Sequence, residues 1–133
     1  MNPTVVVRTT GAHPYANEVA ARGHRIAADE PSDLGGADTG PTPAELLLGA
    51  LGACTSITLR MYAARKGWDL RGVEVDLSLE RGERGAKDRI RRGIRLLGGL
   101  DAEQRARLLE IAGKCPVHRT LEAGAAMETE LAP

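Results

Sequence analysis

A chain of 133 residues is the size of one domain, and its 18 basic and 18 acidic side chains balance to a net charge of zero. That balance gives no argument for a nucleic acid or a membrane surface as partner, and we expect neither. With no Phe and one Trp, the core must be built from Leu, Ile, Val and Ala. The composition therefore predicts a single small domain over residues 1–133.

The start of the chain and the cysteine usage bear on compartment and cofactors. Residues 1–10 lack the basic and apolar segments of a signal peptide, and no apolar run reaches the roughly 18 residues of a membrane span. We expect a cytoplasmic protein, in which two cysteines rarely form a static structural disulfide. Neither cysteine belongs to a Cys-x-x-Cys pair and the histidines are scattered, so we expect no metal and no bound cofactor.

The N-terminal third predicts strands and a long loop. The β-branched residues of 4–9 favour a first strand, and two short extended pieces within 17–28, broken by Gly23, favour a hairpin. Residues 29–43 are dense in Gly, Pro and Asp, which excludes regular structure there. A loop of this length is seldom an idle connector, which weakly indicates a functional role.

The strongest helix signal follows this loop. Thr42 is a natural N-cap, Pro43 fits the first helical position and Glu45 the third, which together form a capping box. The helix should end at Gly67. It is apolar nearly all round up to Arg60, so we expect a central helix that is buried on most sides and lies at a subunit interface.

The second half of the chain predicts further strands and helices. They are a half-buried strand at 73–79, a charged hairpin tip at 81–88, a returning strand at 90–97, a helix from Asp101 to about Gly113, a short helix that Cys115 and Pro116 begin, and a closing strand at 125–131. Elements in this order are typical of an α+β fold. We expect the basic strand residues to be solvated or paired with the acidic strand; the two sets are Arg89, Arg91, Arg92 and Arg95, and Glu74, Asp76 and Glu80.

The two cysteines occupy different kinds of position. Cys54 lies in the middle of the predicted helix among small residues, where a buried cysteine acting as a small hydrophobe is the plainer interpretation. Cys115 precedes Pro116 and so occupies an N-cap, where unpaired amide groups lower a thiol pKa; a cap that happens to be a cysteine is the equal alternative. One thiol that attacks a peroxide and a second that closes a disulfide is the economical interpretation of the pair.

Two segments around these cysteines resemble a known family. PTPAELLLGALGACTSITL and KCPVHRTL closely resemble the two cysteine motifs of the OsmC/Ohr superfamily, the osmotically inducible protein C and organic hydroperoxide resistance proteins. The resemblance implies an OsmC-like α+β fold in which strands surround a long central helix and two subunits intertwine as a homodimer. It also implies an antioxidant, stress-response role: thiol-dependent reduction of organic hydroperoxides at the dimer interface, with electrons returned by a dithiol such as lipoyl groups or small thiols.

The sequence departs from that family near the first cysteine. The family's peroxidases hold an Arg and a Glu near the reactive thiol, and the position of that Glu is Ala44 here. At about 100° per residue, Glu45 falls nearly opposite Cys54 around the helix, so we interpret it as part of the capping box. The candidates to assist the thiols are Arg22 and Arg25 as cations, Asp29, Glu30 and Asp38 as carboxylates, and His118, about one helical turn after Cys115.

Two functional hypotheses follow from these residues. The first is a homodimeric peroxidase in which Cys54 attacks an organic hydroperoxide and Cys115 resolves the product. The alternative is an OsmC-like thiol-binding or redox-sensing module without peroxidase turnover. The missing Glu favours the alternative, whereas the presence of both cysteines favours the peroxidase.

Overall fold

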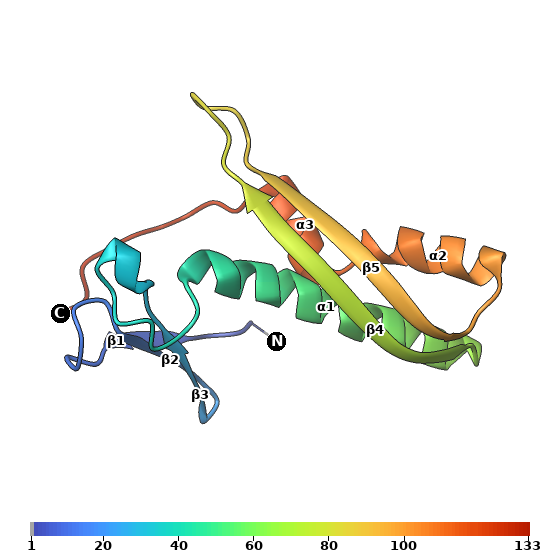
Figure 1. Cartoon of the computed structure of the whole chain (residues 1–133), viewed down its shortest axis with the longest axis horizontal. Helices are drawn as coiled ribbons and strands as arrows, with labels where there is room; N and C mark the ends of the chain where they lie inside the picture. The colour runs from blue at the N-terminus through green and yellow to red at the C-terminus, as the bar shows by residue number, and fades with distance from the viewer. Residues whose placement is uncertain (1) are drawn as a thin grey trace. The chain divides into compact units, whose positions relative to one another are not determined.

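The computed structural model describes residues 2–133 and places the chain in two compact units, Met1–Leu47 and Leu48–Pro133. Strands and helices combine into two small antiparallel sheets and a long central helix, which confirms the predicted α+β class (Figure 1). The division into units does not decide between one domain and two, so the single domain stays a prediction.

The first unit is built on a three-stranded antiparallel sheet. Its strands are β1 (Val6–Thr9), β2 (Asn17–Ala21) and β3 (His24–Ala28), in the order β1-β2-β3. The turn between β2 and β3 holds Arg22 at φ +49° and Gly23 at φ +84°, as a two-residue hairpin turn requires. The predicted first strand and hairpin are therefore confirmed.

A buried carboxylate organises the loop that follows β3. Asp29 accepts hydrogen bonds from the Thr39 hydroxyl at 2.6 Å, the Thr39 amide at 3.1 Å and the Glu30 amide at 2.7 Å. The bond from the Thr39 hydroxyl has the largest effect, and together the bonds hold the pKa of the Asp29 carboxyl below its usual range. The loop is irregular as predicted, apart from a single turn of 3-10 helix, η1 (Ser32–Leu34).

Helix α1 (Pro43–Lys66) begins and ends where the sequence predicts. The Thr42 amide donates to Glu45 Oε1 at 2.8 Å and the Glu45 amide donates to Thr42 Oγ1 at 3.1 Å, so the capping box is confirmed. Gly67, at φ +70°, follows the last turn. By length and composition alone α1 could cross a membrane, a test that the core helix of a soluble protein also passes.

Only one side of α1 is buried within the chain. That side is formed by Leu51, Gly52, Thr55, Leu59 and Ala63. The opposite side carries exposed apolar residues, among them Ile57, which is 55% exposed, and Met61, which is 63% exposed. One chain therefore covers only part of the helix, and the expectation that a subunit interface covers the rest stays a prediction.

A long two-stranded hairpin runs along α1 in the second unit (Figure 1). Strand β4 (Asp69–Glu80) pairs antiparallel with β5 (Arg89–Gly99) around a charged tip. Half-buried and exposed residues alternate along both strands, which confirms the predicted half-buried hairpin. On the exposed face, Arg95 Nη1 lies 2.7 Å from Glu74 Oε2, so the predicted pairing of basic and acidic strands is confirmed at that position.

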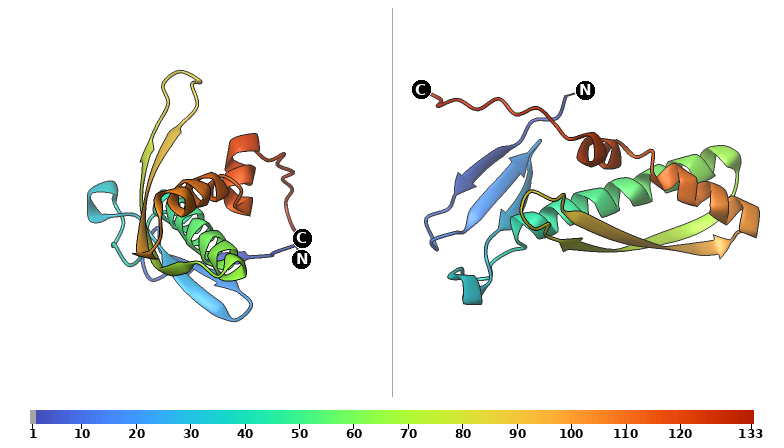
Figure 2. Two further views of the ribbon diagram at one scale, coloured as in Figure 1. Left: turned by 90° about the vertical axis from the view of Figure 1, so that its right-hand side faces the viewer. Right: turned by 90° about the horizontal axis from the view of Figure 1, so that it is seen from above.

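The core of the second unit lies where α1, the hairpin and helix α2 (Ala102–Ala112) meet (Figure 2). It is aliphatic, as the composition predicts, and consists of Leu59, Ala63, Leu70, Leu108, Ile111 and Ala112. Asp101 and Gln104 close a capping box at the start of α2, which confirms the predicted helix start.

Helix α3 (Pro116–Ala123) is the last element of the chain, and Gly124 follows it. Residues 125–131 form no strand, so the predicted closing strand is wrong. A strand requires a neighbour to take up its backbone hydrogen bonds, and within residues 2–133 none pairs with this segment. The side chains of Met127 and Leu131 are accordingly exposed.

A larger side chain at Gly52 should destabilise the second unit. A Cβ at this position would lie 2.9 Å from Leu77 Cδ1, closer than two carbons pack without repulsion. We expect Gly52→Val to lower the free energy of unfolding by about 1–3 kcal/mol, as overpacking does elsewhere. Gly49→Val is the matched control, because Gly49 lies in the same helix and a Cβ there meets no neighbour within 4 Å. Equal losses of stability in urea titrations of the two variants would contradict this account.

Candidate thiol site

Cys115 caps the N-terminus of α3. Its Sγ accepts a hydrogen bond from the His118 amide at 3.3 Å, and Pro116 occupies the first helical position. The residue is fully buried. The predicted N-cap geometry is therefore confirmed, and the thiol is held at the helix start with no exposed surface.

Cys54 lies half-buried on α1 beside this helix start. Burial raises the pKa of the Cys54 thiol, and the neighbouring Cys115 thiol raises it further. The Val117 amide and the Thr58 hydroxyl, which hydrogen-bond the sulfur, act in the opposite direction. The two thiols are thus neighbours from separate elements, and both are free.

The first turn of α3 lies next to both sulfurs. The His118 amide donates to Cys115, and the Val117 amide is near enough to Cys54 to lower the pKa of its thiol. Amide groups in the first turn of a helix have no carbonyl partner within the helix, and the positive end of the helix dipole favours negative charge. The Val117 amide therefore partly offsets the burial that raises the pKa of the Cys54 thiol.

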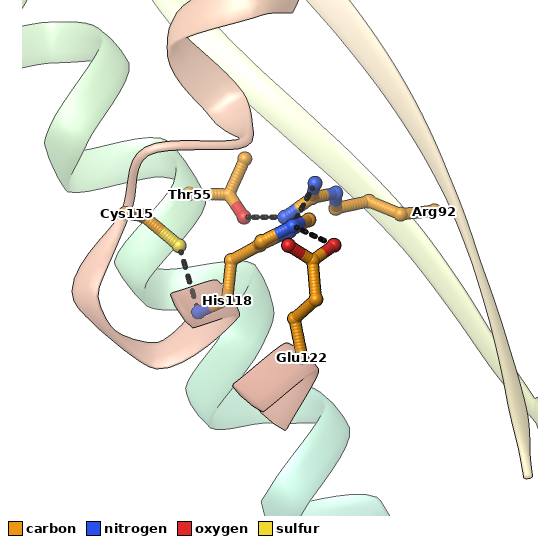
Figure 3. A network of polar contacts seen from close by, with 5 residues as sticks. All are labelled: Thr55, Arg92, Cys115, His118 and Glu122. Atoms are coloured by element: carbon orange, nitrogen blue, oxygen red, sulfur yellow. Dashed lines mark hydrogen bonds and ion pairs between the residues drawn. The ribbon is translucent and has the colours of Figure 1, made fainter. Parts of the chain in front are cut away.

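An arginine from the hairpin joins the two elements that carry the thiols. Arg92 on β5 donates from Nη1 to Thr55 Oγ1 at 3.1 Å and from Nη2 to His118 Nδ1 at 2.9 Å. Thr55 is the residue after Cys54 on α1, and the His118 amide is the donor to Cys115. Figure 3 shows Arg92 reaching across to Thr55 and His118 next to Cys115.

These contacts define the tautomer of His118. A guanidinium has donors and no acceptor, so Nδ1 must accept from Arg92 and the ring proton lies on Nε2. Nε2 is 3.2 Å from Glu122 Oε2, to which it donates (Figure 3). Both ring nitrogens are engaged away from Cys115, and the contact between His118 and that thiol is made by the backbone amide. Assistance by the imidazole itself stays a prediction.

Arg92 is the site residue that the sequence analysis missed. The expectation that it is solvated or paired with the acidic strand is wrong, because it lies on the half-buried face of β5 with Ile90, Ile94 and Leu96. The sequence does contain a signal for this placement. Alternate residues of a strand point to the same face, and these four are alternate residues of β5. The run of Arg91 and Arg92 obscured it.

The other predicted assistants belong to the first unit. Arg25 forms an ion pair with Glu18 across β2 and β3, and Asp29 organises its own loop. Glu30 is half-buried, and its carbonyl accepts from the Asp38 amide at 3.0 Å. The contacts of these residues are thus local to the loop and the sheet, and a role toward the thiols stays a prediction.

Glu45 has the structural role that its position around the helix predicts. Its carboxylate accepts from the Thr42 amide, and that bond lowers the pKa of the Glu45 carboxyl. Ala44 offers no carboxylate. Within residues 2–133, moreover, no three His, Cys, Asp or Glu side chains gather as a metal site would need.

A comparison with protein families decides the affiliation of the chain. Residues 35–130 match the OsmC-like protein family. The chain belongs to the OsmC family. Both cysteine motifs lie inside the matched segment, which confirms the resemblance seen in the sequence. A comparison with curated proteins gives no match.

Solved structures of OsmC proteins share this fold. An OsmC-like protein from Mycoplasma pneumoniae is 18% identical, with a TM-score of 0.79 over 92% of this chain and 88% of its own. The organic hydroperoxide resistance protein OsmC from Legionella pneumophila is 20% identical, with a TM-score of 0.66 over 89% and 88% of the two chains. The organic hydroperoxide resistance protein OhrB of Bacillus subtilis is 22% identical, with a TM-score of 0.60 over 88% and 89%. At these identities the likeness establishes the OsmC fold.

The causes of the raised Cys54 pKa can be separated by alkylation. We expect Cys54 in the folded chain to react with iodoacetamide with a pH midpoint above the roughly 8.5 of an unperturbed cysteine. Cys115→Ser should lower the midpoint without bringing it to that value, because burial, the larger cause, remains. Digestion and mass spectrometry locate the modification, with the urea-unfolded chain as the control. A midpoint at or below the unfolded value would contradict the prediction.

Proposed function

We propose that this OsmC protein is a thiol-dependent peroxidase that reduces organic hydroperoxides through Cys54 and Cys115. The observation that carries the proposal is the pair of neighbouring free thiols, Cys54 on α1 and Cys115 at the start of α3. The names of the Legionella pneumophila and Bacillus subtilis structures, which share the fold, support the choice of substrate.

Each turnover would move two electrons from the thiol pair to the peroxide. The Cys54 thiolate attacks one peroxide oxygen: an S–O bond forms, the O–O bond breaks, and the alkoxide leaves and takes up a proton as the alcohol. The sulfur is left as a sulfenic acid. Cys115, as thiolate, then attacks that sulfur; the S–S bond forms and hydroxide leaves to become water. A lipoyl-type or other small dithiol reduces the disulfide by exchange and is itself oxidised to a disulfide.

The assignment of Cys54 as the attacking thiol is supported by its access to solvent. Cys54 is half-buried, whereas Cys115 has no exposed surface. A peroxide in solution must reach the first sulfur, while the second needs to reach only its neighbour. The attacking sulfur is then the one with the raised pKa, so that turnover should be slow near neutral pH and rise with pH.

We further propose that the protein acts as a homodimer in the cytoplasm. The exposed side of α1 carries an apolar stripe, which consists of Ala50, Ala53, Ile57, Met61 and Ala64. At about 100° per residue these five fall within roughly 80° of one another, and Cys54 lies only about 40° from Ala50. A second copy on this stripe would therefore cover α1 at the edge of the thiol site, where an apolar substrate tail would also be accommodated.

A charge within the stripe should separate such a dimer. We expect light scattering of the wild-type protein to give twice the 14.1 kDa mass of the chain, and Ile57→Glu to give the mass of one chain. A carboxylate buried against apolar side chains without a partner is strongly unfavourable. Ala86→Glu, at the exposed hairpin tip, introduces the same charge as a control. A wild-type protein with the mass of one chain would contradict the homodimer.

A thiol-binding or redox-sensing role without turnover is the second candidate. Two observations favour it: Ala44 stands where the family's peroxidases place a Glu, and burial raises the pKa of Cys54. The first removes the carboxylate that would hold a cation beside the thiol, and the second reduces the thiolate available to a peroxide. A sensor needs only that the pair be oxidised and reduced, however slowly, and so tolerates both.

Kinetics with single-cysteine variants separate the two candidates. With cumene hydroperoxide and a dithiol, we expect slow consumption of peroxide by the wild-type protein and none by Cys54→Ser. Cys115→Ser should be slower than wild type by about tenfold or more, because an external thiol must replace a neighbour that is already in place. Thr120→Ser, on the exposed side of α3, is the control.

The outcomes assign the roles unambiguously. Full activity in Cys54→Ser would overturn the assignment of the attacking thiol. If the wild-type protein consumes no more peroxide than the double variant lacking both thiols, while its disulfide still forms, the sensing role replaces the peroxidase.

A further inference from the structure

We propose that Arg92 is the positioning residue of the thiol site: it holds the start of α3 against α1 so that Cys54 and Cys115 remain within reach of each other. The inference deepens the proposed function, because it names the residue that takes the place of the family's Arg–Glu pair. It concerns the formation of the disulfide, and it can be tested without a peroxide.

The first argument is the set of elements that Arg92 connects. Its side chain starts on β5, and its two terminal nitrogens bond Thr55 on α1 at 3.1 Å and His118 on α3 at 2.9 Å (Figure 3). Thr55 adjoins Cys54 in the chain, and the His118 amide donates to Cys115. Each bond therefore acts on a residue that is directly tied to one of the two sulfurs.

The second argument is the cost of an arginine at this place. Arg92 occupies the half-buried face of β5, where the residues two positions before and after it are Ile90 and Ile94. A guanidinium taken from water is unfavourable unless its donors find acceptors, and an apolar residue would suit the packing of this face. The contacts with Thr55 and His118 satisfy it and fix its direction, as the planar donor fork of arginine permits.

The third argument is the state of the histidine between the charges. With Nδ1 accepting from Arg92, the ring is neutral and its Nε2–H points to Glu122, whose side chain is 78% exposed. The only carboxylate of this network thus bonds the far edge of the ring. The guanidinium of Arg92 and the carboxylate of Glu122 are therefore held at opposite edges of one imidazole ring.

The experiment measures how readily the two thiols join in a glutathione redox buffer. The ratio of disulfide to dithiol, counted by mass spectrometry after acid quenching, gives the effective concentration of one thiol toward the other. We expect Arg92→Met to lower it by about tenfold or more, the scale set by loss of hydrogen bonds to a charged group. Arg92→Lys keeps the charge but has one nitrogen in place of the two that reach Thr55 and His118, so it should give an intermediate value.

Arg91→Met is the matched control, because Arg91 is the neighbour in sequence but lies on the exposed face of the strand. It should leave the disulfide equilibrium unchanged. A second readout is the tautomer of His118, followed by the nitrogen chemical shifts of its ring. Wild type should show the proton on Nε2, whereas Arg92→Met should populate the Nδ1–H form, because the obligatory donor is gone. A loss of packing alone would not shift this balance.

The results separate this inference from the proposed function. An Arg92→Met or Arg92→Lys variant whose thiols join as readily as those of wild type overturns the positioning role, as does a wild-type chain that forms no disulfide in the oxidising buffer. If wild type forms the disulfide, Arg92→Met weakens it and no peroxide is consumed, the inference stands while the peroxidase fails. If Arg92→Met does not fold, the Lys variant decides alone.

Discussion

The burial of one side of α1 is the constraint on which the rest of the second unit depends. Leu59 and Ala63 pack against β4, β5 and α2, and the buried residues of the core they form are aliphatic. Because only this side is covered, the opposite side keeps its apolar stripe, and a residue between the two sides is half-buried. Cys54 is such a residue. The packing that stabilises the unit thereby also sets how far the first thiol is exposed and how strongly burial raises its pKa.

The second thiol depends on a different piece of local chemistry. Pro116 cannot donate a backbone hydrogen bond, so it begins α3 without loss, and Cys115 becomes the cap. The His118 amide then donates to the Cys115 sulfur instead of to a carbonyl oxygen, and the Val117 amide lies near Cys54. Two short sequence features, a cysteine–proline pair and a cysteine at the edge of a buried helix face, together produce a pair of thiols at one helix start.

Local signals in the sequence predicted most of the fold. The capping boxes at Thr42 and Asp101 and the alternation along the hairpin all concern residues within a few positions of one another, and all are confirmed. The contacts of Arg92 were not predicted, and the reason is physical. Its partners Thr55 and His118 are 37 and 26 residues away in the sequence, and no local pattern encodes them. The predicted strand at 125–131 was wrong for a similar reason, because strand formation depends on a pairing partner as well as on side-chain type.

The absence of a glutamate at Ala44 changes how the site can hold a positive charge. A carboxylate placed directly beside a thiol holds an arginine in place, but its own charge raises the pKa of the thiol. In this chain a neutral imidazole lies between the carboxylate of Glu122 and the guanidinium of Arg92, so the negative charge bonds the far edge of the ring. Under the proposed role of Arg92, Glu122 helps to orient Arg92 through the ring of His118. Its negative charge does not lie directly beside a thiol, so it does not repel the thiolate as an adjacent carboxylate would. The groups that shift the pKa of the Cys54 thiol are burial, Cys115, Val117 and Thr58; none of these is a cation, and the net effect is a thiolate that is scarce near neutral pH.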